Sequence, residues 1–219
     1  MKICFLTKIE KAGVEKAIAF TEKISSDIEI FTGDISDPFP QDIQVNSYDM
    51  LISYISPWIV PNEILLKTKL WNINFHPGPP EYPGIGCFNF AIYESAKEFG
   101  VTAHIMNPKV DTGAIIGVKR FVMAIDETVL TLSVKTYQAL LELYKEIIEA
   151  IDENNSLPVC DETWKRKPYK RSDLEKLAII MPDMSKSEIN EKIRATYYAG
   201  NPGPFIELHG HRFEYNPDR

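Results

Sequence analysis

The stretch that decides the fold of this 219-residue chain runs from Trp71 to Gly84 and reads WNINFHPGPPEYPG. Its first part, Trp71 to Phe75, predicts a β-strand. Its second part, residues 76–84, holds four prolines and two glycines in nine residues, which forbids both a helix and a central strand. The stretch therefore predicts an ordered loop at the carboxyl end of a strand, which is where open α/β sheets bind ligands.

Strands and helices alternate in the sequence before this stretch. Strands are predicted over residues 2–7, 28–32 and 48–54, and helices over residues 12–24 and 61–67. The second helix begins at Pro61, a favoured first residue of a helix. This alternation predicts an α/β fold with a doubly wound, mostly parallel sheet.

The sequence after the loop predicts more elements and a boundary. A helix is expected over residues 87–97, strands over 101–106 and 114–122, and a long helix over 126–153. The composition changes near Leu157, so we expect a core at residues 1–156 and a small appendage at residues 157–219. The appendage has a predicted helix over 186–197 and a β-hairpin around Gly210. One domain of roughly 150 residues plus a short appendage fits the chain length.

Composition argues against several classes of protein. The formal net charge is -7, whereas broad nucleic-acid binding needs a clustered excess of Lys and Arg. The three cysteines cannot all pair, so a disulfide framework is not expected. No stretch approaches the roughly 18 apolar residues of a membrane span. We therefore expect a cytoplasmic protein that binds neither nucleic acid nor a membrane.

Three polar residues near predicted strand ends could carry chemistry. Asn74 and His76 share one face of a strand because side chains alternate, and Asp111 lies in a second turn-rich loop. An Asn amide can donate to an oxyanion, a His can transfer a proton near neutral pH, and an Asp can orient the imidazole. The residue types alone indicate acyl transfer or hydrolysis. The alternative is a structural turn at Asn74–His76, with Asp111 capping a loop.

Four motifs extend this set: Asn74-Phe75-His76-Pro77, Pro80-Glu81-Tyr82-Pro83-Gly84, Gly100-Val101-Thr102-Ala103-His104 and Asp111-Thr112-Gly113-Ala114-Ile115. In this order and approximate spacing they resemble the folate-dependent formyltransferase family, over about residues 1–150. The resemblance implies a Rossmann-like core and transfer of a formyl group from N10-formyltetrahydrofolate to a primary amine, without a metal. It matches Asn74, His76 and Asp111 to the catalytic Asn, His and Asp. Asn74 and protonated His76 would stabilise a tetrahedral oxyanion, and Asp111 would assist proton transfer to N10.

Residues 53–61 resemble the pterin-pocket loop of this family, and residues 107–111 match the opposing wall. The resemblance implies that main-chain groups bind the pterin while apolar side chains cover it. The residues expected to bind the cofactor are Ser53, Ile55, Ile59, Asn107, Val110 and Asp111. For Ile55 and Ile59, a place in the hydrophobic core is the alternative.

The expected acceptor is a nucleotide-linked amino sugar, by resemblance to the sugar N-formyltransferase branch, whose substrates are typically dTDP-4-amino-4,6-dideoxyhexoses. The turn after the first strand has a lone glycine, unlike the phosphate loop of the branch that formylates glycinamide ribonucleotide. About 62 residues follow the core, fewer than the oligonucleotide-binding barrel of the methionyl-tRNA branch needs. Alternatives are those two acceptors, another small amine, and an inactive folate-binding module.

A basic and aromatic segment, residues 164–171, could stack on the base and bind the diphosphate of such a substrate. A solvated connector is the alternative. Family resemblance also favours a homodimer. His209 and His211 share a predicted strand face without a third ligand nearby, so no metal is expected, and His104 is expected in the core. The residues expected to bind the substrate are Lys8, Trp164, Lys167, Tyr169, Lys170 and Arg171.

Overall fold

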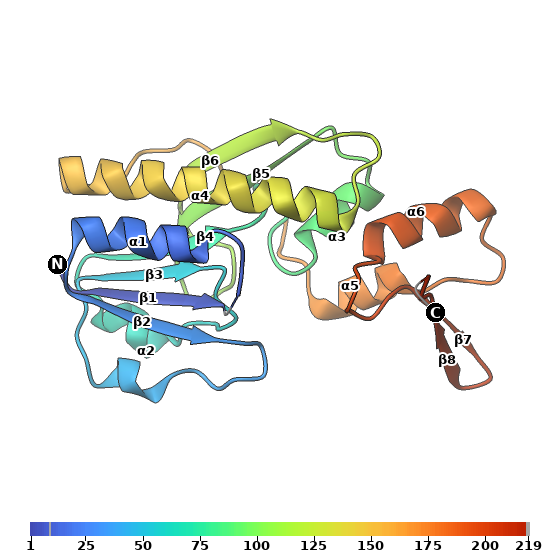
Figure 1. Ribbon diagram of the computed structural model, residues 1–219, viewed down its shortest axis with the longest axis horizontal. Coiled ribbons are helices and arrows are strands. Elements are labelled where there is room, and N and C mark those ends of the chain that lie inside the picture. The colour runs from blue at the N-terminus through green and yellow to red at the C-terminus, as the bar shows by residue number, and fades with distance from the viewer. Residues whose placement is uncertain (9, 218–219) are drawn as a thin grey trace.

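The computed structural model describes residues 1–8 and 10–217 and contains a six-stranded sheet in the order β2-β1-β3-β4-β5-β6 (Figure 1). Strands β1 to β4 pair parallel with one another, whereas β5 pairs antiparallel with both β4 and β6. The predicted α/β class with a mostly parallel sheet is confirmed. The strands are β1 (Ile3–Lys8), β2 (Ile28–Gly33), β3 (Met50–Tyr54), β4 (Trp71–His76), β5 (Glu98–Ile105) and β6 (Ile115–Val122).

Helices cover both faces of the sheet. Helices α1 (Val14–Ile24) and α4 (Val129–Asn154) lie on one face, and α2 (Asn62–Lys67) with the one-turn η1 (Gln41–Gln44) lies on the other (Figure 1). Alternate residues of β1 pack against the helices on opposite faces of the sheet. Phe5 packs in the cluster with α1 and α4, and Leu6 packs in the cluster with α2. Burial on both faces explains why the central strands β1 and β3 are nearly continuous apolar runs.

The direction of β5 determines where the next loop starts. In the antiparallel register, Asn74 of β4 lies opposite His104 of β5, and His76 lies opposite Thr102. Strand β5 therefore begins beyond the carboxyl edge of the parallel strands, passes His76 at Thr102, and ends opposite Ile73, towards the other edge of the sheet. The connection from β5 to β6, residues 106–114, starts at that far edge.

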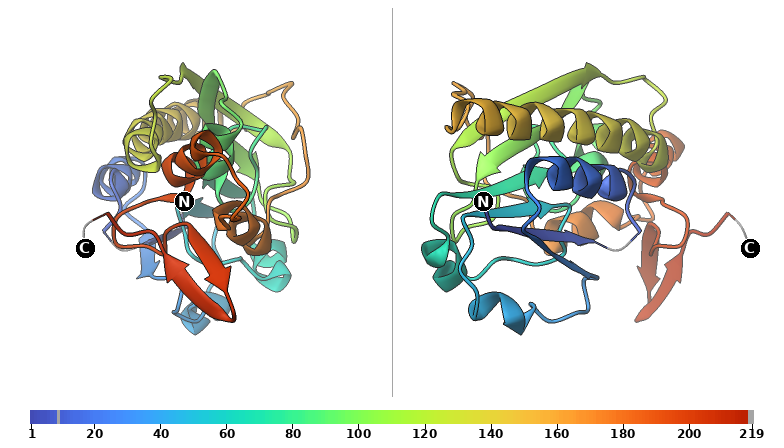
Figure 2. Two further views of the ribbon diagram at one scale, coloured as in Figure 1. Left: turned by 90° about the vertical axis from the view of Figure 1, so that its right-hand side faces the viewer. Right: turned by 60° about the vertical axis from the view of Figure 1, so that its left-hand side comes forward.

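The appendage packs beside α3 (Cys87–Tyr93), and the hairpin projects from the same end of the molecule (Figure 2). Leu177 and Ala195, from two appendage helices, share a hydrophobic cluster with Phe90 of α3. The hairpin around Gly210 is confirmed, and the expected boundary between residues 156 and 157 stays a prediction. The appendage elements are α5 (Arg171–Ala178), α6 (Lys186–Thr196), β7 (Phe205–Leu208) and β8 (His211–Glu214).

Two details differ from the sequence-based expectation. Helix α3 ends at Tyr93 rather than near residue 97, and Ser95 takes a left-handed φ of 53°, which a continuing helix does not allow. Helix α5 was not predicted, because it is short and begins in the basic segment. None of the helices in residues 1–8 and 10–217 is long and apolar enough to cross a membrane.

Candidate active site

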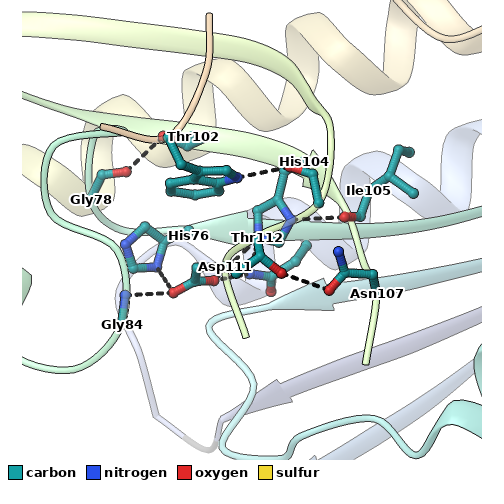
Figure 3. Close-up of polar contacts among 12 residues, drawn as sticks. His76, Gly78, Gly84, Thr102, His104, Ile105, Asn107, Asp111 and Thr112 are labelled. Carbon is teal, nitrogen blue, oxygen red and sulfur yellow. Dashed lines mark hydrogen bonds and ion pairs between the residues drawn. The ribbon is translucent and has the colours of Figure 1, made fainter. Parts of the chain in front are cut away.

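Asn74 and His76 stand on the sheet face opposite α1 and α4. They lie beside His104 and Thr102 of the neighbouring strand, and Figure 3 shows His76, Thr102 and His104 close together. Side chains two residues apart in a strand share a face, and so do side chains directly opposite each other in an antiparallel pair. The four polar residues therefore form one patch at the junction of β4 and β5. The residues that alternate with these four in β4 and β5 belong to the core on the other face of the sheet; they are Ile73, Phe75, Val101 and Ala103.

The loop between β5 and β6 brings Asp111 to this patch. Its loop starts at the far edge of the sheet and folds back, so that the carboxylate lies over the β4–β5 patch (Figure 3). Asp111 has a left-handed φ of 46°, a conformation that costs a non-glycine residue about 1 kcal/mol or more. The Thr112 hydroxyl holds the turn by donating to Oδ1 of Asn107, at 2.8 Å, and to the carbonyl of Lys109.

The Asp111 carboxylate is buried and shared between two imidazoles. Its Oδ2 lies 3.3 Å from Nδ1 of His76 and accepts a 2.8 Å hydrogen bond from the N–H of Gly84. Its Oδ1 lies 3.2 Å from Nε2 of His104 and 3.4 Å from Nδ2 of Asn74. Burial by itself would raise the pKa of Asp111, but the two histidines and the Gly84 N–H outweigh it and hold that pKa well below its usual range.

Both ring nitrogens of His76 face hydrogen-bond acceptors. Nδ1 faces the carboxylate of Asp111, and Nε2 lies 3.0 Å from the carbonyl oxygen of Tyr82. Both partners are acceptors, so each of the two contacts is favourable only when the ring nitrogen that makes it carries a proton. A ring in this state can donate a hydrogen bond to a developing oxyanion, which is the role expected of it.

His104 is a site residue that sequence reasoning placed only in the core. It is buried as expected, but its Nε2 also lies 3.0 Å from Nδ2 of Asn74 and 3.2 Å from Asp111. Its Nδ1 lies 2.9 Å from the carbonyl of Ile105. The signal that could have found it is the strand register, because His104 stands directly opposite Asn74.

The loop after β4 passes close to His76 at Gly78. A Cβ atom at Gly78 would lie 2.6 Å from Nε2 of His76 and 2.9 Å from Cβ of Cys87. The hydroxyl of Thr102 donates to the Gly78 carbonyl at 2.8 Å and fixes the loop against β5 (Figure 3). Glycine at this position thus lets the backbone approach the imidazole closely.

The residues expected to bind the cofactor surround this patch. Ser53 lies next to Asn74 in the β3–β4 register, and Ile55 follows β3 with a left-handed φ of 54°. Ile59 and Val110 are 70% and 42% exposed, which is unusual for large apolar side chains. Asn107 is exposed and holds the Asp111 turn. Cofactor contact by these residues stays a prediction.

The residues expected to bind the substrate do not lie together. Trp164 reaches the active-site patch, with its ring centroid 5.1 Å from that of His104. Tyr169 is stacked on Phe90 at 3.5 Å, and the Arg166 guanidinium lies 3.8 Å from its ring centroid. Lys8 pairs with Asp34 at 2.8 Å. The side chains of Lys167, Lys170 and Arg171 are exposed, and all six assignments stay predictions.

A cavity of about 480 Å³ lies between the core and the appendage, and Arg171 lines it. Two further cations, Lys11 and Arg212, contribute to its wall together with one carboxylate, that of Glu175. Aromatic rings also line it, from Phe88, Tyr137, Tyr198 and Phe205. The cavity thus combines positive charge with flat apolar surfaces.

The histidines of the hairpin are arranged differently from the expectation. His209 lies in the turn with a left-handed φ of 51°, and His211 begins β8, so the two do not share one strand face. The residues that the structure describes contain no cluster of three or more His, Cys, Asp or Glu side chains suited to hold a metal ion. The expectation that the site uses no metal stays a prediction.

Comparison with known proteins identifies relatives of this fold. Residues 41–148 match the family model described as formyl transferase. GDP-perosamine N-formyltransferase of Brucella melitensis is 26% identical over 163 residues, which cover 74% of this chain and 62% of that protein. Methionyl-tRNA formyltransferase of Dictyoglomus thermophilum is 29% identical over 191 residues, which cover 84% of this chain and 54% of that protein. The match thus spans less than two thirds of each relative's length.

Solved structures resemble the chain over nearly its whole length. A sugar N-formyltransferase from Shewanella sp FDAARGOS_354 superposes with a TM-score of 0.77 at 18% identity, covering 98% of this chain and 96% of that chain. The N-formyltransferase from Helicobacter canadensis, in complex with folinic acid and dTDP-3-aminofucose, superposes with a TM-score of 0.74 at 18% identity. The superposition covers 96% of this chain and 85% of that chain. At these identities the likeness establishes the fold.

Proposed function

Because residues 41–148 match the formyl transferase family model, we propose that the chain transfers a formyl group from N10-formyltetrahydrofolate to the amino group of a nucleotide-linked amino sugar. The observation that carries the proposal is the buried cluster in which Asp111 contacts Asn74 and His76. An amide donor, an imidazole and a carboxylate in one cluster are the groups that acyl transfer to an amine needs.

In the proposed reaction the neutral amine attacks the formyl carbon, and the bond from that carbon to N10 breaks. The Asn74 amide and protonated His76 donate hydrogen bonds to the formyl oxygen as it becomes negative. For this, Nε2 of His76 exchanges the carbonyl of Tyr82, now 3.0 Å away, for the substrate oxygen. Asp111 holds the imidazolium, and one proton moves overall from the amine to N10, so the charges balance.

The folate is proposed to bind between residues 53–61 and residues 107–111. Ile59 and Val110 are exposed, so they offer an apolar surface on which a pterin ring can lie. Ser53 and Asn74 are neighbours in register, which puts the proposed pterin wall beside the proposed oxyanion donor. The Helicobacter canadensis relative, solved with folinic acid, supports a folate as the co-substrate.

The acceptor is proposed to be a dTDP-4-amino-4,6-dideoxyhexose or a similar nucleotide-linked sugar. The cavity of about 480 Å³ supplies the chemistry that a nucleotide needs, since Lys11 and Arg171 suit a diphosphate and Phe88 and Tyr137 suit a base. The relatives named above act on GDP-perosamine or were solved with dTDP-3-aminofucose, which supports a nucleotide-linked amino sugar without choosing the nucleotide.

Methionyl-tRNA is the second candidate acceptor, because the Dictyoglomus thermophilum enzyme is 29% identical over 84% of this chain. The net charge of -7 argues against it, since binding a polyanion needs an excess of basic residues. A homodimer is also proposed. Leu208, Phe213 and Tyr215 on and beside the projecting hairpin are exposed apolar side chains that a second subunit could cover.

The test of the proposal is a formylation assay with N10-formyltetrahydrofolate and four acceptors. These are a dTDP-amino sugar, a GDP-amino sugar, glycinamide ribonucleotide and methionyl-tRNA. We expect the mass spectrum to show a formamide on at least one sugar nucleotide and on neither of the other two acceptors. Formylation of only glycinamide ribonucleotide or methionyl-tRNA would contradict the proposed acceptor, and no formylation at all would contradict the proposed activity.

A further inference from the structure

Residues 162–169, here called the strap, lie along the loop that follows β4. The N–H of Lys165 donates to the carbonyl of Pro80 at 3.0 Å, and the N–H of Tyr169 donates to that of Pro83 at 2.9 Å. The carbonyl of Tyr169 accepts in turn from the N–H of Ile85 at 3.0 Å. The strap therefore pairs with the catalytic loop through the main chain, although it lies in the appendage sequence.

Side chains fasten the strap at both ends. At its start, Arg120 of β6 pairs with Glu162 at 2.9 Å and with Glu81 of the catalytic loop at 2.9 Å. At its end, the Tyr169 hydroxyl donates to Glu94 at 2.9 Å while the ring stacks on Phe90. The same Glu94 side chain accepts from the hydroxyl of Tyr82, a residue of the catalytic loop. The strap is thus fixed to the loop on which His76 depends.

Trp164 extends from the strap into the active-site patch. Its indole N–H donates to the carbonyl of Gly113 at 2.8 Å, two residues beyond Asp111. Its ring meets both catalytic-site imidazoles edge-on, with centroids 5.1 Å from His104 and 6.0 Å from His76 and interplanar angles of 83° and 69°. One side chain therefore touches the Asp111 loop and both of its histidine partners.

The Asp111 turn needs such support. Asp111 is held in the left-handed region, and the turn passes so close to β5 that a Cβ at Gly113 would lie 1.7 Å from the carbonyl oxygen of Ile105. The Trp164 bond adds to the other contacts of this turn. These include the Thr112 hydroxyl within the loop, the contacts of the Asp111 carboxylate with Gly84, His76, His104 and Asn74, and the main-chain bond from Ile105 to Ala114.

We propose that Trp164 is a positioning residue, which holds the Asp111 turn through Gly113 and fixes the imidazoles of His76 and His104 with its ring edge. This inference rests on the proposed function for its kinetic consequence, and on geometry alone for the placement of the indole. It makes the strap a necessary part of the active site. It also assigns to Trp164 a use different from stacking on a nucleotide base.

The kinetic test compares Trp164→Phe and Trp164→Ala with the control Trp71→Phe, at the start of β4. Phe keeps a ring but loses the N–H that bonds to the Gly113 carbonyl, so we expect kcat to fall by about two- to tenfold. Ala should lower it further, with KM for both substrates within about twofold in each variant. An unchanged kcat in Trp164→Ala, or a rise in acceptor KM as the main effect, would overturn the proposal.

A second test needs no catalysis and separates this inference from the proposed function. In the Trp58→Phe/Trp71→Phe protein, Trp164 is the remaining tryptophan, since the chain has three. Because the ring of His104 contacts the indole, the emission of Trp164 should change when His104 is replaced. We expect His104→Gln to change the intensity or the wavelength of this emission. Emission that is unchanged by His104→Gln would overturn the placement of the indole, whether or not the protein formylates any acceptor.

Discussion

Oδ2 of Asp111 lies 3.3 Å from Nδ1 of His76, and both side chains are about 5% exposed. The second ring nitrogen of His76, Nε2, faces the carbonyl oxygen of Tyr82. The buried pair therefore orients the ring so that Nε2, when it carries a proton, can serve as a hydrogen-bond donor. The central prediction of the account is that this donor, together with Asn74, acts on a formyl oxygen.

The Asp111 pair predicts a pH dependence of stability. The folded-state pKa of Asp111 lies below its unfolded value of about 3.9. The contribution of Asp111 to the free energy of unfolding is therefore complete above the unfolded-state pKa, and it is lost as the pH falls through the folded-state pKa. Asp111→Asn should lower the free energy of unfolding by about 2 kcal/mol at about pH 6, because it removes charge-assisted hydrogen bonds. The deficit should shrink towards about pH 3.

Urea unfolding at the two pH values measures this difference. The control is Asp152→Asn, an exposed position of α4, for which we expect a change of less than about 0.5 kcal/mol at both pH values. If the deficit of Asp111→Asn were the same at both pH values, the charge of Asp111 would not be what stabilises the pair.

Asn74→Ala should affect turnover far more than binding. An oxyanion donor is worth about 3 kcal/mol in comparable acyl-transfer sites, so kcat should fall about 100-fold or more while KM for both substrates changes little. Steady-state kinetics checks this against Asn46→Ala, whose side chain bonds to Glu29 and lies outside the site. Near-normal turnover by Asn74→Ala would remove Asn74 from the oxyanion site.

Much of the fold followed from the sequence, and some of the site did not. Asn74 and His76 could be placed together because alternation within one strand fixes their shared face. The approach of Asp111 could not be derived, because the reversal of β5 is a matter of tertiary pairing. Placing His104 in the site required knowledge of the β4–β5 register. The contact of Trp164 with the site joins segments about fifty residues apart in the sequence. No local pattern reports such a contact.

Ile59→Ser tests the proposed folate site between residues 53–61 and residues 107–111. The side chain is 70% exposed, so the substitution should change the free energy of unfolding by less than about 0.5 kcal/mol. If a pterin covers it, KM for N10-formyltetrahydrofolate should rise about tenfold, since burying such a side chain contributes about 1.5–3 kcal/mol. Ile125→Ser, in an exposed turn before α4, is the matched control. An unchanged folate KM would place the pterin elsewhere.

Lys11→Ala and Arg171→Ala test the cavity between the core and the appendage. Each should raise KM for the nucleotide-linked acceptor by about tenfold, because a charge-assisted hydrogen bond contributes about 1.5–3 kcal/mol, and neither should change the folate KM. The control is Lys186→Ala, an exposed cation at the start of α6. If both variants kept the acceptor KM of the unaltered protein, the nucleotide would not lie in this cavity.

Transfer of an isotope-labelled formyl carbon tests the central claim most directly. The unaltered protein and Asn74→Ala are each mixed with labelled N10-formyltetrahydrofolate and a dTDP-4-amino-4,6-dideoxyhexose, and the carbon is followed by NMR. The account predicts that the label appears as a sugar formamide with the unaltered protein and at least 100-fold more slowly with Asn74→Ala. Label that stays on the folate with every nucleotide-linked amino sugar tested, or that moves equally fast in both proteins, would contradict it.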